Sequence, residues 1–283
     1  MESPRSVRAV VTAVVWALIA LSGPSASGPA TAHASVLPET GSCAFRLAAS
    51  PVAAPPVGAG PCHGVRPGAY VAAPQGGCTL NFVFRAREKT AEGTRSVRYV
   101  GTAGHCALGA ARERSWAPNK GPKAFDVAGR KIGEFVYAVL EPGEGLIGAY
   151  RDFALIRLDG DVKSSIAMCH FGGPTGINAD MGGGPVVVHH YGQGLGWGET
   201  IPARTSVVRS LNDPDVAGAT GAINYGDSGA GVISADGRAL GVVVQFIDES
   251  GPDLIGITRI RPQMLRAEKV LDVDLTLLKA ALS

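Results

Sequence analysis

The chain has 283 residues, of which 46% are hydrophobic and 18% are charged, and its formal net charge is +2. This near-neutral balance, without basic runs or interleaved aromatic residues, lacks the electrostatic footprint of a nucleic-acid-binding protein, so we expect no nucleic-acid partner. The 39 glycines and 19 prolines favour short strands joined by turns over a helical protein.

The N-terminal segment has the pattern of a secretory signal peptide. Two arginines precede a compact apolar run at residues 9–21, and a stretch of small residues follows it and ends at Ala34. The run is shorter than the roughly 20 residues that a membrane-spanning helix needs. We expect residues 1–34 to be cleaved off and the mature protein to be secreted without stable membrane association. The alternatives are cleavage after Ala26 and retention as an uncleaved anchor.

Residues 35–74 are rich in Ala, Pro and Gly and show no sustained periodicity, which predicts an extended lead-in or a short pro-segment. Short apolar or alternating runs follow, each of strand length and each bounded by Gly, Pro, Asp or Asn. The predicted strands are Leu80–Phe84, Val97–Thr102, Phe135–Leu140, Phe153–Leu158, Val186–His190, Ser206–Arg209, Gly231–Ser234, Ala239–Phe246 and Leu254–Thr258. Asp236-Gly237, between two of these runs, predicts a hairpin.

The last segment, Pro262–Leu282, has the one strong helical pattern of the chain. Its predicted apolar stripe consists of Leu265, Val270, Leu271, Leu275, Leu277 and Leu278. Strands followed by one terminal helix predict an all-β fold of two small barrels packed together. We place the first barrel at residues 75–175 and the second, with the helix, at 176–283.

Three short motifs occur in the order His, Asp, Ser. They are GTAGHC at 101–106, RDFALIRL at 151–158 and GDSG at 226–229. A serine hydroxyl is a poor nucleophile near neutral pH and needs an adjacent base. Histidine suits that role because its reference pKa is about 6.5, and a buried aspartate fixes its tautomer. The combination predicts a catalytic triad of His105, Asp152 and Ser228.

In order and spacing, these motifs resemble those of the chymotrypsin-like or trypsin-like serine protease family, in its bacterial secreted branch. The resemblance implies a chymotrypsin-like double β-barrel with a C-terminal helix, and a protein or peptide substrate. It implies that Ser228 is the nucleophile, His105 the general base and acid, and Asp152 the carboxylate that orients the imidazole. The backbone N–H groups of Gly226 and Ser228 would form the oxyanion hole.

We expect no cofactor and no metal ion. The one adjacent pair of histidines, His189 and His190, lies in a predicted strand, where neighbouring side chains point to opposite faces. This alternation argues against a metal ion shared by the two rings.

The resemblance also implies a disulfide between Cys78 and Cys106, which would staple the loop that carries the histidine, and export permits such a bond. Cys169 resembles a family cysteine that is tied to the N-terminal segment. Cys62 is its preferred partner and Cys43 the alternative. A pairing of Cys43 with Cys62, leaving Cys169 free, is also open.

Three features depart from the family pattern. No Ile-Val-Gly-Gly sequence precedes Cys78, so activation by a new N-terminus that pairs with Asp227 is not supported, and we expect Arg204 to take that place. Gly229 is followed by Ala-Gly rather than Gly-Pro. The strand that normally presents Ser-Trp-Gly to the substrate reads Val244-Gln245-Phe246.

The specificity pocket is expected at Ala222 and Phe246. Ala222 lies six residues before Ser228, where trypsin-like members carry the aspartate that selects Lys or Arg, and Phe246 lies where related enzymes leave a glycine at the pocket mouth. These residues predict cleavage after small or medium neutral side chains. The alternatives to an endopeptidase are a binding module that keeps the fold without turnover, and an esterase that uses the same triad.

Overall fold

The structure is a computed structural model that describes residues 62, 64–91, 93–142, 149–182, 185–194, 203–209, 211–247 and 254–280. The expected signal peptide, most of the expected lead-in segment and Cys43 lie outside the described residues. Strands dominate this part of the chain, with a single helix near the C-terminus. None of its helices is both long and apolar enough to cross a membrane.

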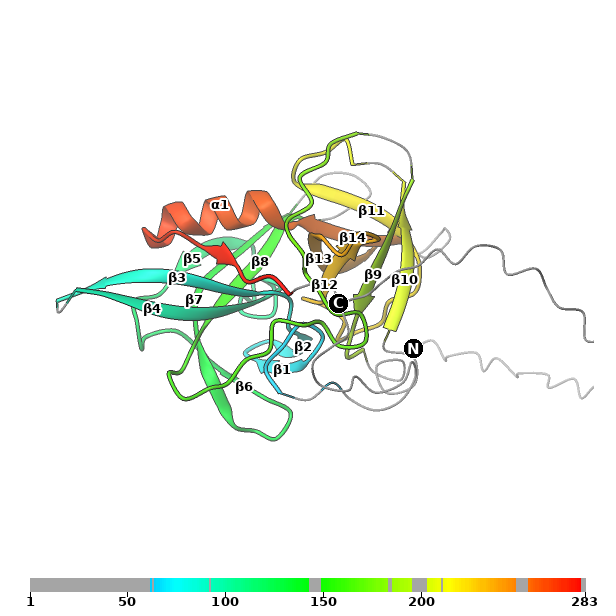
Figure 1. The fold of residues 1–283 in the computed structure, drawn as a ribbon. Coiled ribbons are helices and arrows are strands. Elements are labelled where there is room, and N and C mark those ends of the chain that lie inside the picture. Colours follow the sequence, from blue (N-terminus) through cyan, green and yellow to red (C-terminus); the bar gives the residue numbers. More distant parts are fainter. Residues whose placement is uncertain are drawn as a thin grey trace, which may run out of the picture. The chain divides into compact units, whose positions relative to one another are not determined.

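The first half of the described chain forms one antiparallel sheet, drawn from cyan to green in Figure 1. Its strands are β1 (Tyr70–Ala73), β2 (Gly76–Thr79), β3 (Val83–Thr90), β4 (Gly93–Thr102), β5 (Arg112–Ser115), β6 (Lys123–Phe125), β7 (Lys131–Pro142), β8 (Ala149–Leu158) and the C-terminal β15 (Thr276–Leu277). The strand order is β15-β3-β4-β8-β7-β6-β1-β2, and β5 pairs with β7.

The chain itself links the two ends of this sheet. Three residues, 80–82, separate β2 at one end of the strand order from β3 near the other end. In that gap the N–H of Asn81 donates to the carbonyl of Gly101 at 2.8 Å, and the N–H of Gly101 donates to the carbonyl of Phe82 at 3.0 Å. The pairing with β4 therefore continues from β3 toward β2, and the sheet curls into the first of the two expected barrels.

The second half forms a closed barrel of six antiparallel strands, namely β9 (Val186–Tyr191), β10 (Ala203–Val208), β11 (Val216–Thr220), β12 (Gly231–Ser234), β13 (Ala239–Ile247) and β14 (Leu254–Arg259). Their order around the barrel is β10-β11-β14-β13-β12-β9. The predicted hairpin at Asp236-Gly237 joins β12 to β13, which pair directly. This barrel carries the loop between β11 and β12, where Ser228 lies.

The two barrels have different cores. The first is built around large aromatic side chains, among them Phe84 and Phe153. Both are fully buried, and their rings pack edge to face with their centroids 6.3 Å apart. The second is filled by smaller aliphatic side chains such as Val188, Val232 and Ile257. Short strands supply both cores, and in several of them, such as β7 and β12, neighbouring residues are buried without alternation.

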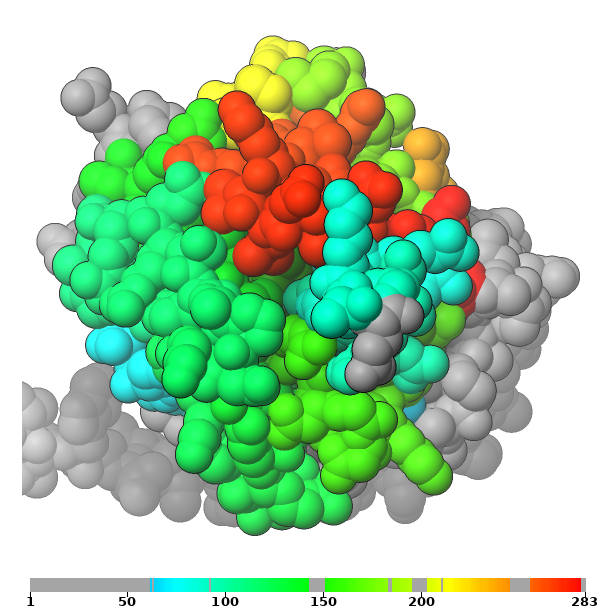
Figure 2. Space-filling view, turned by 90° about the vertical axis from the view of Figure 1, so that its left-hand side faces the viewer, coloured from blue at the N-terminus to red at the C-terminus, as the bar shows by residue number. Residues whose placement is uncertain are grey.

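The C-terminal helix α1 (Ile260–Leu271) is confirmed, but it is shorter than predicted, and its apolar stripe is wrong. Ile260, Gln263, Met264 and Ala267 are buried, whereas Leu265 is 57% exposed. Figure 2 shows α1, in orange and red, lying on the surface of the first barrel. Asp272 ends the helix in a left-handed conformation, so the following leucines extend as β15 instead of completing a helical face.

The predicted fold class, an all-β double barrel with a C-terminal helix, is confirmed. The first strand begins at Tyr70, ahead of the boundary expected at residue 75. Six strands escaped prediction, namely β1, β2, β5, β6, β11 and β15. They are short, and β5 is exposed along its whole length, so it has no alternation of buried and exposed side chains from which to predict it.

Candidate active site

The His105–Asp152 pair is formed by two neighbouring strands of the first barrel. β4 and β8 pair so that Thr102 lies opposite Ala154. The turn that begins after Thr102 therefore reaches Asp152, two residues before Ala154. The His105 backbone N–H bonds Asp152 Oδ1 at 2.9 Å, and the ring Nδ1 lies 2.6 Å from Asp152 Oδ2. Both carboxylate oxygens thus hold the same residue, which fixes the imidazole in position.

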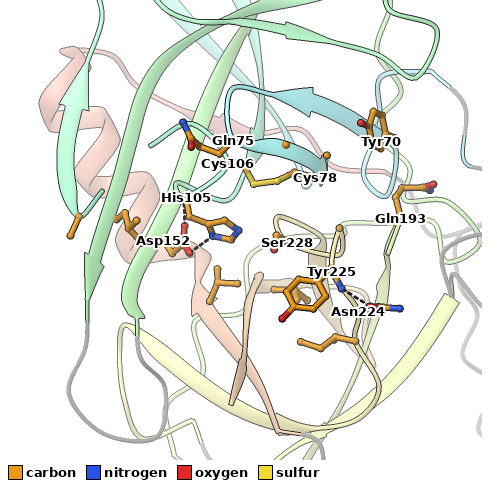
Figure 3. A pocket seen from close by; sticks show the side chains of 18 of the residues that line it. Tyr70, Gln75, Cys78, His105, Cys106, Asp152, Gln193, Asn224, Tyr225 and Ser228 are labelled. Atoms are coloured by element: carbon orange, nitrogen blue, oxygen red, sulfur yellow. Dashed lines mark hydrogen bonds and ion pairs between the residues drawn. A yellow bond between two sulfur atoms is a disulfide. The ribbon is translucent and has the colours of Figure 1, made fainter. Parts of the chain in front are cut away.

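Burial of the His105 ring opposes its protonation, but the hydrogen bond and the charge of Asp152 outweigh this effect and raise the pKa of His105 above 6.5. Asp152 itself is buried, with 2% of its side chain exposed. A buried carboxylate on Nδ1 leaves Nε2 as the ring atom that can accept a proton. In Figure 3 the second nitrogen of His105 faces into the pocket, on the side where Ser228 lies.

The nucleophile loop, residues 224–230, is held tightly by backbone contacts. Gly229 has a φ of +92°, and a Cβ there would lie 2.3 Å from both the carbonyl of Thr79 and Thr102 Oγ1. No larger residue fits, because the loop packs directly against the first barrel. Gly226, with a φ of +101°, also needs the conformational freedom of glycine. These two glycines explain the residue types on either side of Asp227-Ser228.

Two N–H groups of this loop stand out. Three other N–H groups of the loop donate to backbone carbonyls: that of Asp227 to the carbonyl of Asn224 at 3.0 Å, that of Gly229 to the carbonyl of Val243 at 2.7 Å, and that of Ala230 to the carbonyl of Asp227 at 2.8 Å. The N–H groups of Gly226 and Ser228 donate to no acceptor within the described part of the chain. They are the two groups expected to form the oxyanion hole, and they are available for an anionic oxygen.

Asp227 pairs with Arg204, as predicted from the sequence. The ion pair is buried, with 4% of the arginine side chain and 1% of the aspartate side chain exposed. Asp227 also accepts the N–H groups of Gly194 at 2.8 Å and Asn224 at 2.7 Å. Arg204 of β10 therefore supplies the positive charge that holds Asp227, and with it the nucleophile loop, in place.

All three predicted triad residues line one pocket of about 820 Å³ (Figure 3). No hydrogen bond joins His105 to Ser228 Oγ in the described structure. Catalytic hydrogen bonds are often long in a free enzyme and tighten only when substrate is bound. The pocket therefore brings the three residues together with the nucleophile and base not yet in contact.

The pocket wall differs from the one expected from the sequence. Ala222 is exposed and does not line the pocket, whereas its neighbour Ile223 does. Val243 and Val244 form a second apolar part of the wall. The side chain of Phe246 lies outside the described residues. The prediction for Ala222 is corrected accordingly, because the chain turns it toward solvent.

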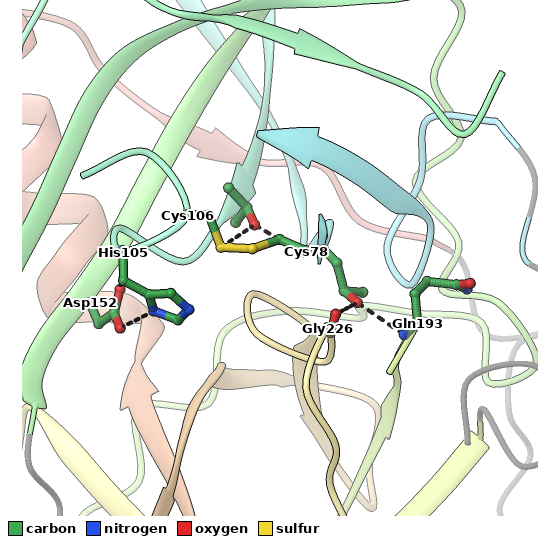
Figure 4. The surroundings of a disulfide bond; sticks show 8 residues. Cys78, His105, Cys106, Asp152, Gln193 and Gly226 are labelled. Atoms are coloured by element: carbon green, nitrogen blue, oxygen red, sulfur yellow. Dashed lines mark hydrogen bonds and ion pairs between the residues drawn. A yellow bond between two sulfur atoms is a disulfide. The ribbon is translucent and has the colours of Figure 1, made fainter. Parts of the chain in front are cut away.

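Both preferred disulfides are present. Cys78 and Cys106 are joined with their Cα atoms 6.4 Å apart, and Cys62 and Cys169 with theirs 6.0 Å apart. Figure 4 shows the Cys78–Cys106 bond next to the turn that carries His105. Cys78, His105 and Cys106 lie close enough to suggest a metal site, but both sulfur atoms are used in the disulfide.

His189 and His190 point in different directions. His189 Nδ1 lies 2.8 Å from Thr205 Oγ1, and its ring stacks on Phe171. His190 is buried, and desolvation lowers its pKa to about 3, with the charge of Arg204 acting in the same sense. Each ring thus has its own structural surroundings.

Sequence reasoning missed several residues around the nucleophile, above all Thr79, Gln193 and Tyr225. Tyr225 is 76% exposed at the pocket edge. Thr79 directly follows a cysteine expected to form a disulfide, which placed it near the site, but no pattern in the sequence assigns its hydroxyl a role.

No model of a protein family matches the sequence, and no curated protein matches it. Several solved structures do match the structure of this chain. Cellulomonas bogoriensis chymotrypsin is 16% identical with a TM-score of 0.47, covering 76% of this chain and 99% of that one. Thermobifida fusca protease A is 15% identical with a TM-score of 0.47, covering 76% and 99%.

An alpha-lytic protease homologue is 15% identical with a TM-score of 0.44, covering 74% of this chain and 97% of that one. These structures are bacterial chymotrypsin-like serine proteases, the family that the sequence motifs resemble. At such identities and TM-scores the likeness carries no argument about activity.

Proposed function

We propose that the protein is an exported serine endopeptidase that hydrolyses peptide bonds through an acyl-enzyme. One observation carries the proposal. The His105–Asp152 pair, Ser228 and the free N–H groups of Gly226 and Ser228 converge on a single pocket between the barrels. A binding module has no physical need for this combination of base, nucleophile and oxyanion donors.

The geometry supports the following course. Ser228 Oγ attacks the carbonyl carbon of the scissile peptide while His105 Nε2 takes its proton, and Asp152 stabilises the resulting imidazolium. The developing oxyanion accepts the N–H groups of Gly226 and Ser228. His105 then gives the proton to the leaving amine, and a water molecule, deprotonated by His105, cleaves the acyl-enzyme and regenerates Ser228.

The pocket wall supports a preference for small or medium neutral side chains before the cut bond. Ile223, Val243 and Val244 are apolar, and among the described residues that line the pocket the one carboxylate is Asp152, which is already paired with His105. A buried Lys or Arg side chain would have no free counter-charge there, and an unpaired buried cation costs several kcal/mol.

Export is supported by two observations. The N-terminal pattern is that of a signal peptide, and the two disulfides are bonds that persist in oxidising compartments.

The test is covalent labelling of the purified mature protein with a fluorophosphonate, followed by peptide mapping. We expect the label on Ser228, and none in Ser228→Ala. Turnover of a peptide amide separates an endopeptidase from an esterase, which would hydrolyse the matching ester alone. Failure to label Ser228 in folded protein would favour the binding module.

A further inference from the structure

Thr79, the last residue of β2, ties the first barrel to the nucleophile loop. It is fully buried. Its hydroxyl donates to the carbonyl of Gly226 at 2.7 Å and accepts the N–H of Gln193 at 3.0 Å. Its backbone N–H donates to the carbonyl of Ser228 at 2.8 Å. In Figure 4, dashed lines from Gly226 and from Gln193 mark these two bonds next to Cys78. One residue thus holds the loop at two points.

The two carbonyls held by Thr79 belong to the same residues that supply the oxyanion donors. The peptide group after Gly226 is fixed at one end by Thr79 and at the other by the bond from Asp227 N–H to Asn224. The peptide group after Ser228 is fixed in the same way by Thr79 and by the bond from Gly229 N–H to Val243. The N–H of Ser228 lies between these two fixed planes, and the N–H of Gly226 belongs to the peptide directly before the first, so both donors adjoin restrained backbone.

This restraint matters most at Gly226. Glycine has the widest range of backbone conformations, and Gly226 sits at a φ of +101° without a side chain to hold it. Donors of an oxyanion hole act because they are already oriented before the charge develops. The Thr79 hydroxyl supplies that orientation from the opposite barrel.

We infer that Thr79 is a positioning residue for the oxyanion hole, whose hydroxyl fixes the peptide after Gly226 and thereby the backbone between the two donors, so that both point at the reacting carbonyl oxygen. The inference rests on the proposed function. Thr79 does not line the pocket, so it acts through Gly226 and Ser228 and not on the substrate.

The test compares Thr79→Val, which keeps the shape but lacks the hydroxyl, with Thr79→Ser, which keeps the hydroxyl. Ser234→Ala is the matched control. Ser234 is also buried, its hydroxyl contacts Asn178 at 3.2 Å and Asp236 at 2.6 Å, and it lies outside the pocket. Each variant is measured for kcat and KM on a peptide amide, for inhibition by a peptide aldehyde, and for its unfolding midpoint. The aldehyde adduct places an oxyanion in the hole.

We expect Thr79→Val to lower kcat by about ten- to a hundredfold, less than complete loss of one donor, with KM nearly unchanged. Aldehyde affinity should fall by the same factor. Thr79→Ser should recover most of the rate, and Ser234→Ala should lose stability while keeping kcat.

Three outcomes would overturn the inference. One is an unchanged kcat in Thr79→Val, and another is an equal kcat loss in Ser234→Ala. If Thr79→Val does not fold, Thr79→Ala replaces it, and failure of both to fold assigns the hydroxyl to stability alone. A wild-type protein with no turnover and no label on Ser228 instead rejects the proposed function, and the inference with it.

Discussion

The two barrels prepare their shares of the site in different ways. The first barrel holds His105 by side-chain contacts, since both oxygens of Asp152 bond the same residue. The second barrel holds Ser228 through its backbone, and the Ser228 hydroxyl makes no hydrogen bond in the described structure. The base is therefore fixed by its partner, whereas the nucleophile is fixed by the loop around it. Changes in the two halves should have different consequences.

The largest effect on activity is expected from a change in the first barrel, at Asp152. Asp152→Asn keeps the shape of the side chain but removes the charge and favours the wrong tautomer of His105. We expect kcat to fall about ten-thousandfold, as in comparable triads. Steady-state kinetics on a peptide amide measures the loss, and an unfolding curve checks that the fold is kept. A loss below tenfold would show that His105 does not depend on Asp152.

In the second-barrel half, the largest effect is expected on stability. Arg204→Met leaves the carboxylate of Asp227 buried without its partner, and removing one member of a buried pair costs about 3 to 5 kcal/mol. Denaturant unfolding measures the change. Arg266→Met is the control, because its pairs with Glu113 and Glu141 are partly exposed. Such pairs contribute about 0 to 1 kcal/mol. Equal losses in the two variants would contradict the special role of Arg204.

The next largest effect, again on stability, is expected from loss of the Cys78–Cys106 disulfide beside His105. The Cys78→Ala/Cys106→Ala double variant removes a cross-link between residues 28 apart in sequence. In the chain-entropy model a loop of this size contributes about 3 to 4 kcal/mol. Unfolding of oxidised wild type and of the variant measures the difference. Peptide mapping that finds either thiol free in oxidised wild type would refute the pairing.

The pH dependence of kcat/KM tests the first-barrel half alone, because it depends on the protonation of His105. His105 must be neutral to accept a proton, and its pKa is raised above 6.5, mainly because Asp152 outweighs the effect of burial. The acid limb of kcat/KM should therefore lie above 6.5 and move down in Asp152→Asn. A raised folded-state pKa stabilises the protein below the unfolded pKa, and this contribution is lost as the pH rises through the folded value. An acid limb that stays in place in the variant would assign it to another group.

The sequence predicted the features that depend on short motifs at strand ends. His105 and Asp152 end up together because their motifs flank paired strands, and Arg204 was predicted from the need of Asp227 for a cation. The stripe on the helix was wrong because helical periodicity continued past Asp272, where the backbone leaves the helix. The contact between Thr79 and Gly226 spans 147 residues, and no local pattern encodes it.

The smallest effect is expected at the specificity pocket, which belongs to the second barrel. Ile223 lines the pocket, whereas Ala222 faces solvent. In Ile223→Asp a carboxylate enters the apolar wall and can pair with a cationic side chain. The ratio of cleavage after Lys or Arg to cleavage after Leu should then rise by about tenfold or more. Ala222→Asp, one residue away, should leave this ratio unchanged because its carboxylate would be in water. A peptide library assayed with Ser228→Ala as the blank measures both variants. A larger shift in Ala222→Asp would place the base of the pocket at Ala222, and efficient Ser228-dependent cleavage after Lys by the wild type would show that a counter-charge already lies within reach of the pocket.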